Sequence, residues 1–221
     1  MSSVSSLRTI QSHSVSEQVY ETIRDAIINK KLEPGSTVTE AQLASTLGVS
    51  KTPVREAFIR LREIGLLQAQ HPRGMQVISD DQESIETAWE TREVLEAAAV
   101  YYAAERAAAD DVNAIKSLAQ RSLTAALDED PLAFREADQK LHNRIWQASG
   151  NTEIARITEN SYTLASALRE MREPSPGFSE MCARQHVQIS EAIERRNPPQ
   201  ARDRMLEHIK SVRKGRPSKS S

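Results

Sequence analysis

The first third of the chain alternates short apolar segments with turn residues. Val15, Val19, Ile23 and Ile27 recur at every fourth position, which is the spacing of one helical face. Capping residues and glycines then delimit two shorter helices, and two short apolar runs flank a tight turn after Gly65. The predicted elements are helices over about 16–30, 39–47 and 50–64 and strands over about 66–70 and 75–78.

The chain beyond Asp80 is rich in Ala, Leu, Glu and Arg, and its helix-breaking residues fall mostly between helical segments. The predicted helices there cover about 81–107, 110–128, 131–149, 151–172, 178–196 and 198–213. The predicted fold class is therefore mainly α. It combines an N-terminal winged helix-turn-helix, with a small β-hairpin as the wing, and a C-terminal antiparallel bundle of about six helices.

Composition narrows the class of protein. No stretch of the 221 residues approaches the roughly 20 consecutive apolar positions of a membrane-spanning helix. The N-terminus lacks the apolar run of a secretory signal, and a single cysteine, Cys182, rules out an intrachain disulfide. We therefore expect a cytoplasmic protein without a membrane partner.

The net charge of −2 divides unevenly along the chain. Residues 1–78 carry nine Lys or Arg against seven Asp or Glu, and the remainder carries 20 against 24. The basic balance lies in the N-terminal part. This small difference permits DNA binding there without arguing strongly for it.

The third predicted helix has the proportions of a recognition helix, whose N-terminal residues contact base edges in the major groove. Val54, Phe58 and Leu61 share its inward face, and Arg55 on the opposite face could read a guanine edge bidentately. The alternative is a charged face that is only solvated. The hairpin favours DNA binding, because its tip could approach the DNA backbone. The residues predicted to contact DNA are Ser50, Lys51, Thr52, Arg55, His71, Arg73 and Gly74.

Polar residues interrupt the inward stripes of three helices in the predicted bundle. Asp138 and His142 lie one turn apart on one helix, and His186 and His208 lie on the inward stripes of two others. A buried carboxylate needs a partner, and three imidazoles with one carboxylate suit a divalent ion. The sequence predicts a metal site with Zn²⁺ as the first choice and Ni²⁺ or Mn²⁺ as alternatives. A lone inward histidine is more often a core residue.

Arg92 and Glu96 also fall on an inward stripe, together with Trp89. One interpretation is an ion pair within the helix. The other is that Arg92 binds the carboxylate of a small effector, with Glu96 beside it.

The chain resembles GntR-family regulators, specifically the FadR branch. The segments that carry the resemblance in the N-terminal part are Val19–Arg24, Leu32–Gly35, Leu43–Ala57 and Leu61–Leu66. Two positions depart from the pattern, because Lys51 stands where many members have Arg and Ala41 where some have a basic DNA contact. The operator sequence therefore cannot be carried over.

The C-terminal part is similar to the FadR C-terminal ligand-binding domain over Phe134–Asn151, His186–Ile193 and His208–Ile209. The resemblance implies that Asp138, His142, His186 and His208 hold a metal ion, and that an acidic effector binds at or near its open coordination positions. It also implies a regulator and not an enzyme. A metal-dependent hydrolase that uses the same four residues is the alternative from another class. A third interpretation keeps DNA binding and makes the helical domain only a dimer scaffold.

The sequence thus predicts a repressor whose affinity for a palindromic double-stranded operator is controlled by a small carboxylate effector. Dimerisation of the bundles would set two recognition helices on two half-sites. The expected organisation is a flexible N-terminus at 1–15, a DNA-binding domain at 16–78, an effector-binding and dimerisation domain at 79–213 and a basic disordered tail at 214–221.

Overall fold

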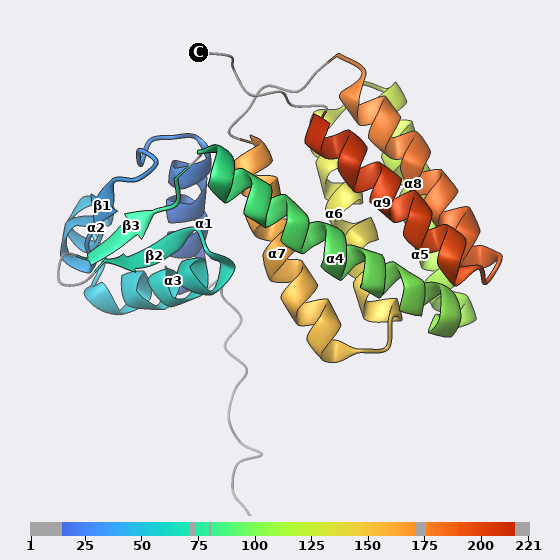
Figure 1. Ribbon diagram of the computed structural model, residues 1–221. Coiled ribbons are helices and arrows are strands. Elements are labelled where there is room, and N and C mark those ends of the chain that lie inside the picture. Colours follow the sequence, from blue (N-terminus) through green and yellow to red (C-terminus); the bar gives the residue numbers. More distant parts are fainter. Residues whose placement is uncertain (1–14, 71–73, 80, 171–175, 215–221) are drawn as a thin grey trace, which may run out of the picture. The chain divides into compact units, whose positions relative to one another are not determined.

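The computed structural model describes residues 15–70, 74–79, 81–170 and 176–214. The chain divides after Ser79 into two compact units, an N-terminal unit and a helical unit (Figure 1). No helix in the ranges described combines the length and the apolar character needed to cross a membrane. Each unit has its own set of buried residues.

The N-terminal unit contains three helices and a small sheet. Its elements are α1 (Val15–Ile28), β1 (Thr37–Val38), α2 (Glu40–Leu47), α3 (Lys51–Ile64), β2 (Leu67–Gln70) and β3 (Gly74–Val77). The strands are antiparallel in the order β1-β3-β2, and Leu67 pairs with Val77. The predicted hairpin is confirmed. The sequence missed β1, because two residues are too few to show a periodicity.

Local capping residues set the ends of α2 and α3. The Thr39 hydroxyl accepts a hydrogen bond from the Gln42 backbone N–H at 3.2 Å, and the Gln42 side chain accepts one from the Thr39 N–H at 3.1 Å. This is the predicted capping box. Gly48 ends α2 with a φ of +67°. Ser50 occupies the N-cap position of α3, but its hydroxyl makes no capping hydrogen bond.

The core of the N-terminal unit lies between α1, α3 and the sheet. The inward face predicted for α3 is confirmed, since Val54, Phe58 and Leu61 are at most 2% exposed. These side chains are joined in the core by Ile23, Ile27, Leu66 and Leu67. Val15 is 54% exposed at the start of α1, so the apolar stripe of that helix begins one turn later than the sequence predicts.

Gly74 is required by the sheet itself. Its φ is +116°, and a Cβ atom at this position would lie 2.5 Å from the carbonyl oxygen of Val38 on the neighbouring strand. Only a residue without a side chain permits this approach between β1 and β3. The prediction that Gly74 contacts DNA stays a prediction, because the fold already explains the glycine.

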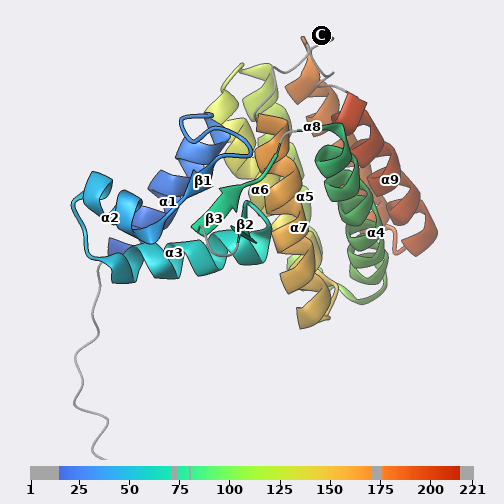
Figure 2. The ribbon, with the colours of Figure 1, turned by 60° about the vertical axis from the view of Figure 1, so that its left-hand side comes forward.

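The helical unit contains six helices within the described ranges, as the sequence predicts. They are α4 (Gln82–Arg106), α5 (Ala109–Leu127), α6 (Pro131–Ala148), α7 (Thr152–Glu170), α8 (Phe178–Glu194) and α9 (Pro198–Lys214). α4 packs against α7 and α9, and α5 packs against α6 and α8 (Figure 2). Helix starts follow from local chemistry. Asp130, for example, accepts hydrogen bonds from two backbone N–H groups of the first turn of α6.

Candidate metal centre and recognition helix

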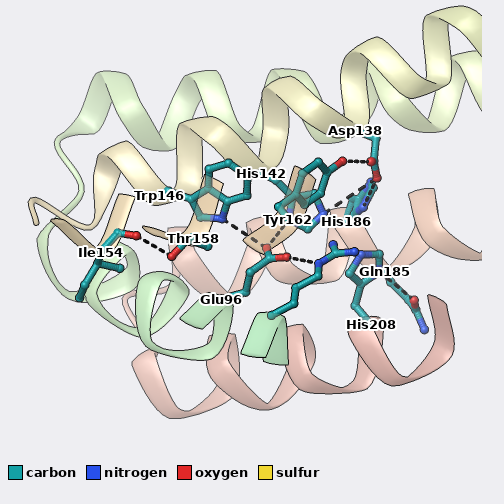
Figure 3. Close-up of polar contacts among 11 residues, drawn as sticks. Glu96, Asp138, His142, Trp146, Ile154, Thr158, Tyr162, Gln185, His186 and His208 are labelled. Atoms are coloured by element: carbon teal, nitrogen blue, oxygen red, sulfur yellow. Dashed lines mark hydrogen bonds and ion pairs between the residues drawn. The ribbon is translucent and has the colours of Figure 1, made fainter. Parts of the chain in front are cut away.

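Three histidines from three helices converge inside the helical unit. His142 lies on α6, His186 on α8 and His208 on α9, and each is at most 1% exposed. Their ring centroids are 4.7 to 5.4 Å apart. One ligand nitrogen from each ring lies within 4.8 Å of the others (Figure 3). The spacing brings three imidazole nitrogens within reach of a single ion.

Each histidine is held through Nδ1. His142 Nδ1 bonds to Glu96 Oε2 at 2.5 Å, His186 Nδ1 to Ser122 Oγ at 2.9 Å and His208 Nδ1 to Gln185 Oε1 at 3.1 Å. The three Nε2 atoms, in contrast, are buried and have no hydrogen-bond partner. Buried nitrogens are rarely left unpaired. Metal-binding histidines commonly show this arrangement, with one nitrogen fixed by an outer partner and the other free for an ion.

Asp138 supplies an oxygen to the same cluster. The side chain on α6 is buried, and its Oδ1 lies 3.3 Å from His186 Nε2 and 3.9 Å from His142 Nε2. The Tyr162 hydroxyl on α7 donates a hydrogen bond to Oδ2, which leaves Oδ1 directed toward the histidines. The structure therefore brings together all four residues that the sequence predicts as metal ligands.

The protonation states also suit a cation. Burial acts to raise the pKa of Asp138, but the nearby His142 and His186 outweigh it and hold the pKa below its usual value. Burial lowers the pKa of His186 to about 3, and burial and the other two imidazoles hold the pKa of His208 well below its usual value. Asp138 is thus ionised at pH 7, and His186 and His208 are neutral, as metal ligation requires.

Arg92 and Glu96 form a buried ion pair beside the cluster. Arg92 Nε lies 2.5 Å from Glu96 Oε1, and both side chains are at most 1% exposed. Burial acts to raise the pKa of Glu96, but His142 and Arg92 lower it to about 2. The Glu96 carboxylate is engaged by Arg92, His142 and the Trp146 indole. The guanidinium retains one free group, since Arg92 Nη1 has no hydrogen-bond partner.

In the N-terminal unit, α3 divides as predicted. Ser50, Lys51, Thr52 and Arg55 are exposed at its N-terminal end, and Val54 is buried behind them. The Arg55 guanidinium is bound by Glu40 of α2 through three hydrogen bonds of 2.9 to 3.1 Å. The predicted wing contacts His71 and Arg73 lie outside the described residues.

Sequence reasoning missed the residues that support these sites. Glu40 binds Arg55, whereas Ser122, Gln185 and Tyr162 bind three of the four predicted ligands. Each comes from a different helix than the residue it supports. Such pairings depend on helix packing. A single sequence carries no signal for them.

A small winged helix-turn-helix followed by a helical unit with a buried polar cluster defines a class of ligand-responsive transcription regulators. Residues 15–77 match the family model of bacterial regulatory proteins of the gntR family, and residues 87–211 match that of the FCD domain. The chain therefore belongs to the GntR family. It is a DNA-binding transcription regulator with an FCD ligand-binding domain, and the predicted resemblance is confirmed at that level.

Several relatives align over nearly the full chain. The transcriptional repressor RspR of Escherichia coli K12 is 25% identical over 198 residues, which cover 90% of this chain and 87% of that protein. The transcriptional regulator YdhC of Bacillus subtilis is 26% identical and covers 87% and 86%. A putative L-lactate dehydrogenase operon regulatory protein of E. coli K12 is 28% identical and covers 90% and 84%. These relatives are regulators and not enzymes, which argues against the hydrolase alternative.

Solved structures show the same fold. E. coli McbR/YncC matches with a TM-score of 0.71 at 20% identity and covers 89% of this chain and 94% of that one. A GntR regulator from Rhodococcus sp. RHA1 matches with a TM-score of 0.66 at 22% identity, over 90% and 95%. The metal-free FCD domain of TM0439 matches with a TM-score of 0.51 at 23% identity, over 61% and 92%.

Proposed function

We propose that this chain is a repressor that binds a palindromic operator as a homodimer and responds to a small organic acid bound beside a metal ion in the helical unit. The observation that carries the proposal is the set of three buried Nε2 atoms without a hydrogen-bond partner, two of which lie 3.3 and 3.9 Å from the Asp138 carboxylate. The C-terminal match to the FCD domain supports our further assignment to the FadR branch.

Asp138, His142, His186 and His208 would hold the ion. One carboxylate and three imidazoles form a donor set that suits Zn²⁺, with Ni²⁺ and Mn²⁺ as alternatives. The bound ion would supply a fixed positive charge that attracts an anionic ligand. Ser122, Gln185 and Glu96 would keep the imidazole rings oriented through their Nδ1 atoms.

Arg92 is the residue that we propose binds the effector carboxylate. Its Nη1 is buried without a hydrogen-bond partner, and its guanidinium lies 4.6 Å from the ring of Tyr162, which is itself bonded to Asp138. A carboxylate between Arg92 and the metal would satisfy this donor. Glu96 would act indirectly by holding the guanidinium in place, since its own oxygens are already engaged.

The homodimer is supported by α4, which has apolar residues on two faces. One face, which includes Trp89 and Ala99, is buried in the bundle. Val94 lies on another face and is 71% exposed. Val94 is therefore a large apolar side chain of α4 that the bundle leaves uncovered. Val94 opens onto a groove of about 640 Å³ between α4 and α9, whose lining residues are Glu90, Glu93, Val94, Ala97, Ala98, Tyr101, Tyr102, Arg202 and Leu206.

A second copy of this chain fits the groove by its charge pattern. Glu93 of α4 lies 3.4 Å from Lys210 of α9, and Arg202 precedes Lys210 by about 12 Å along that helix. Glu90 and Glu93 thus lie toward one end of the groove, and Arg202, which also pairs with Asp203, lies toward the other. A two-fold axis across α4 would place each acidic end over the basic end of the partner, with the small Ala97 and Ala98 at the crossing.

The dimer surface can be tested by sedimentation of purified protein. We expect the wild-type chain to be a dimer and Val94→Glu to be a monomer. Leu132→Glu is the matched control, because Leu132 is 74% exposed on α6 and lies outside the groove. A dimer that survives Val94→Glu would contradict this surface.

The repressor assignment is supported by the sequence similarity to RspR, which is a transcriptional repressor. An effector could lower operator occupancy only by binding one arrangement of the dimer more tightly than the other. We propose that the effector-bound arrangement is the one that releases DNA.

The experiment for the sensor is metal content per chain in protein purified without a metal-affinity tag. We expect about one ion per chain in the wild type and none in His186→Ala. Ser190→Ala is the matched control, because Ser190 is a buried polar residue one turn later on α8 that bonds only to its own helix. Wild-type protein that binds no ion would favour the alternative, in which the helical unit is only a dimer scaffold.

A further inference from the structure

Arg55, an exposed arginine near the start of α3, is bound by a carboxylate from the neighbouring helix. Arg55 Nε lies 3.1 Å from both oxygens of Glu40, and Nη2 lies 2.9 Å from Oε2. The Arg55 side chain is 63% exposed, and that of Glu40 is 31% exposed. An acidic residue at the centre of a proposed DNA-binding face is unexpected, because it repels phosphates.

The contact leaves the guanidinium able to read a base. A guanidinium has five N–H groups, and Glu40 uses the edge formed by Nε and one hydrogen of Nη2. The other edge, formed by Nη1 and the second hydrogen of Nη2, remains available. Bidentate recognition of guanine O6 and N7 needs two parallel N–H groups of this kind. Glu40 and a guanine can therefore bind Arg55 at the same time.

Glu40 is itself firmly placed. It is the first residue of α2, directly after the Thr39 capping box, where the partial positive charge of the helix end favours a carboxylate. The hydrogen bonds from Arg55 hold the pKa of Glu40 below its usual value despite partial burial, with a further contribution from Lys51. The carboxylate is thus ionised, and it anchors a side chain that would otherwise sample many rotamers.

We infer that Glu40 is a positioning residue for DNA recognition, and that its carboxylate holds the Arg55 guanidinium with its free edge ready for a guanine in the operator. The inference rests on the recognition role proposed for Arg55. Glu40 is then expected to have two opposite effects. It strengthens binding to the specific site by ordering Arg55, and its negative charge weakens nonspecific binding to other DNA.

The test starts from a site that the wild-type protein selects from a pool of duplexes with a randomised centre. Affinities are then measured for the selected duplex and for a scrambled duplex of equal composition. We expect Glu40→Gln to bind the selected duplex roughly tenfold more weakly, since Arg55 must then be ordered by the DNA. We expect the same variant to bind the scrambled duplex more tightly, because a negative charge is lost.

Two further variants distinguish the effect of the position of the Glu40 carboxylate from the effect of its charge. Glu40→Asp keeps the charge but shortens the side chain, so it should weaken specific binding and leave scrambled binding unchanged. Glu63→Gln removes an exposed acid from the last turn of α3 and should not weaken specific binding. In an Arg55→Ala background, Glu40→Gln should no longer weaken binding to the selected duplex.

Each result bears on a different step. Specific binding by Glu40→Gln that is equal to or tighter than that of the wild type would overturn the positioning role, and would make Glu40 a competitor of DNA for Arg55. Full affinity in Arg55→Ala alone would refute the recognition role of Arg55, and the inference with it. A wild-type protein that enriches no sequence would refute the proposed operator binding as a whole.

Discussion

The candidate site of the N-terminal unit is exposed, whereas that of the helical unit is buried. In the N-terminal unit, the candidate DNA contacts Ser50, Lys51, Thr52 and Arg55 are exposed and lie within six residues of one another at the start of α3. In the helical unit the candidate ligands are buried and come from α6, α8 and α9. An exposed cation can remain without a partner, whereas a buried polar atom cannot. The buried Nε2 atoms of the helical unit, which lack a hydrogen-bond partner, are therefore the stronger indication of a ligand.

The largest effect is expected at the exposed helix. Arg55→Ala should weaken binding to the selected duplex by about 2–6 kcal/mol for a dimer with two half-sites, since one bidentate arginine–guanine pair contributes about 1–3 kcal/mol. Its thermal unfolding should match that of the wild type. Fluorescence anisotropy and calorimetry measure the two quantities, and unchanged affinity would remove Arg55 from the recognition face.

A glycine of the wing should show the next largest effect, on stability. Gly74→Ala places a Cβ atom 2.5 Å from the Val38 carbonyl oxygen at a φ of +116°, and should destabilise the N-terminal unit by about 2–4 kcal/mol. Gly48→Ala is the control, because φ is +67° there and nothing lies within 4 Å of the added atom. Denaturant unfolding of both variants tests this, and equal losses would contradict the close approach.

In the helical unit, the outer partners of the histidines should have a smaller effect. Ser122→Ala and Gln185→Ala each remove one Nδ1 hydrogen bond and should lower metal affinity about 10-fold to 100-fold, as loss of an outer partner usually does. Competition with a chromophoric chelator measures the affinity. Ser190→Ala should bind metal like the wild type. If both outer variants did so too, the rings would not need these partners.

The smallest effect concerns a local signal in the N-terminal unit. Thr39→Ala removes the hydroxyl that accepts a hydrogen bond from the Gln42 backbone N–H, and it should lower the free energy of unfolding by about 1 kcal/mol. Thr46→Ala is the comparison, because its hydroxyl only bonds back to Gln42 within the same helix. A loss for Thr46→Ala as large as that for Thr39→Ala would show that the cap contributes nothing special.

The two units also differ in how far the sequence predicts them. The capping box at Thr39 and the breaks at Gly48 and Gly65 depend on neighbouring residues, so α2, α3 and the hairpin could be found from the sequence. Burial of Asp138 and the three histidines followed from their position on apolar stripes. The two-residue strand β1 escaped notice because its pairing with β3 crosses more than 30 residues.

What the sequence could not show is how the polar side chains are paired. Ser122 lies on α5 and gives no sign that it faces His186 on α8. From the sequence, Glu40 is only a favourable first residue of a helix. Its contact with Arg55 depends on the angle between α2 and α3. These contacts are set by packing between helices, which periodicity alone does not determine.

The central claim is that the buried cluster of the helical unit is a metal site open to an organic acid. Titration of metal-free protein with Co²⁺ tests it most directly, because visible absorption reports both the stoichiometry and the ligands. We expect one equivalent to bind the wild type, a spectrum that changes when small carboxylates are added, and no saturable binding in Asp138→Ala. A wild-type chain that binds no Co²⁺, or whose spectrum no carboxylate changes, would contradict the account.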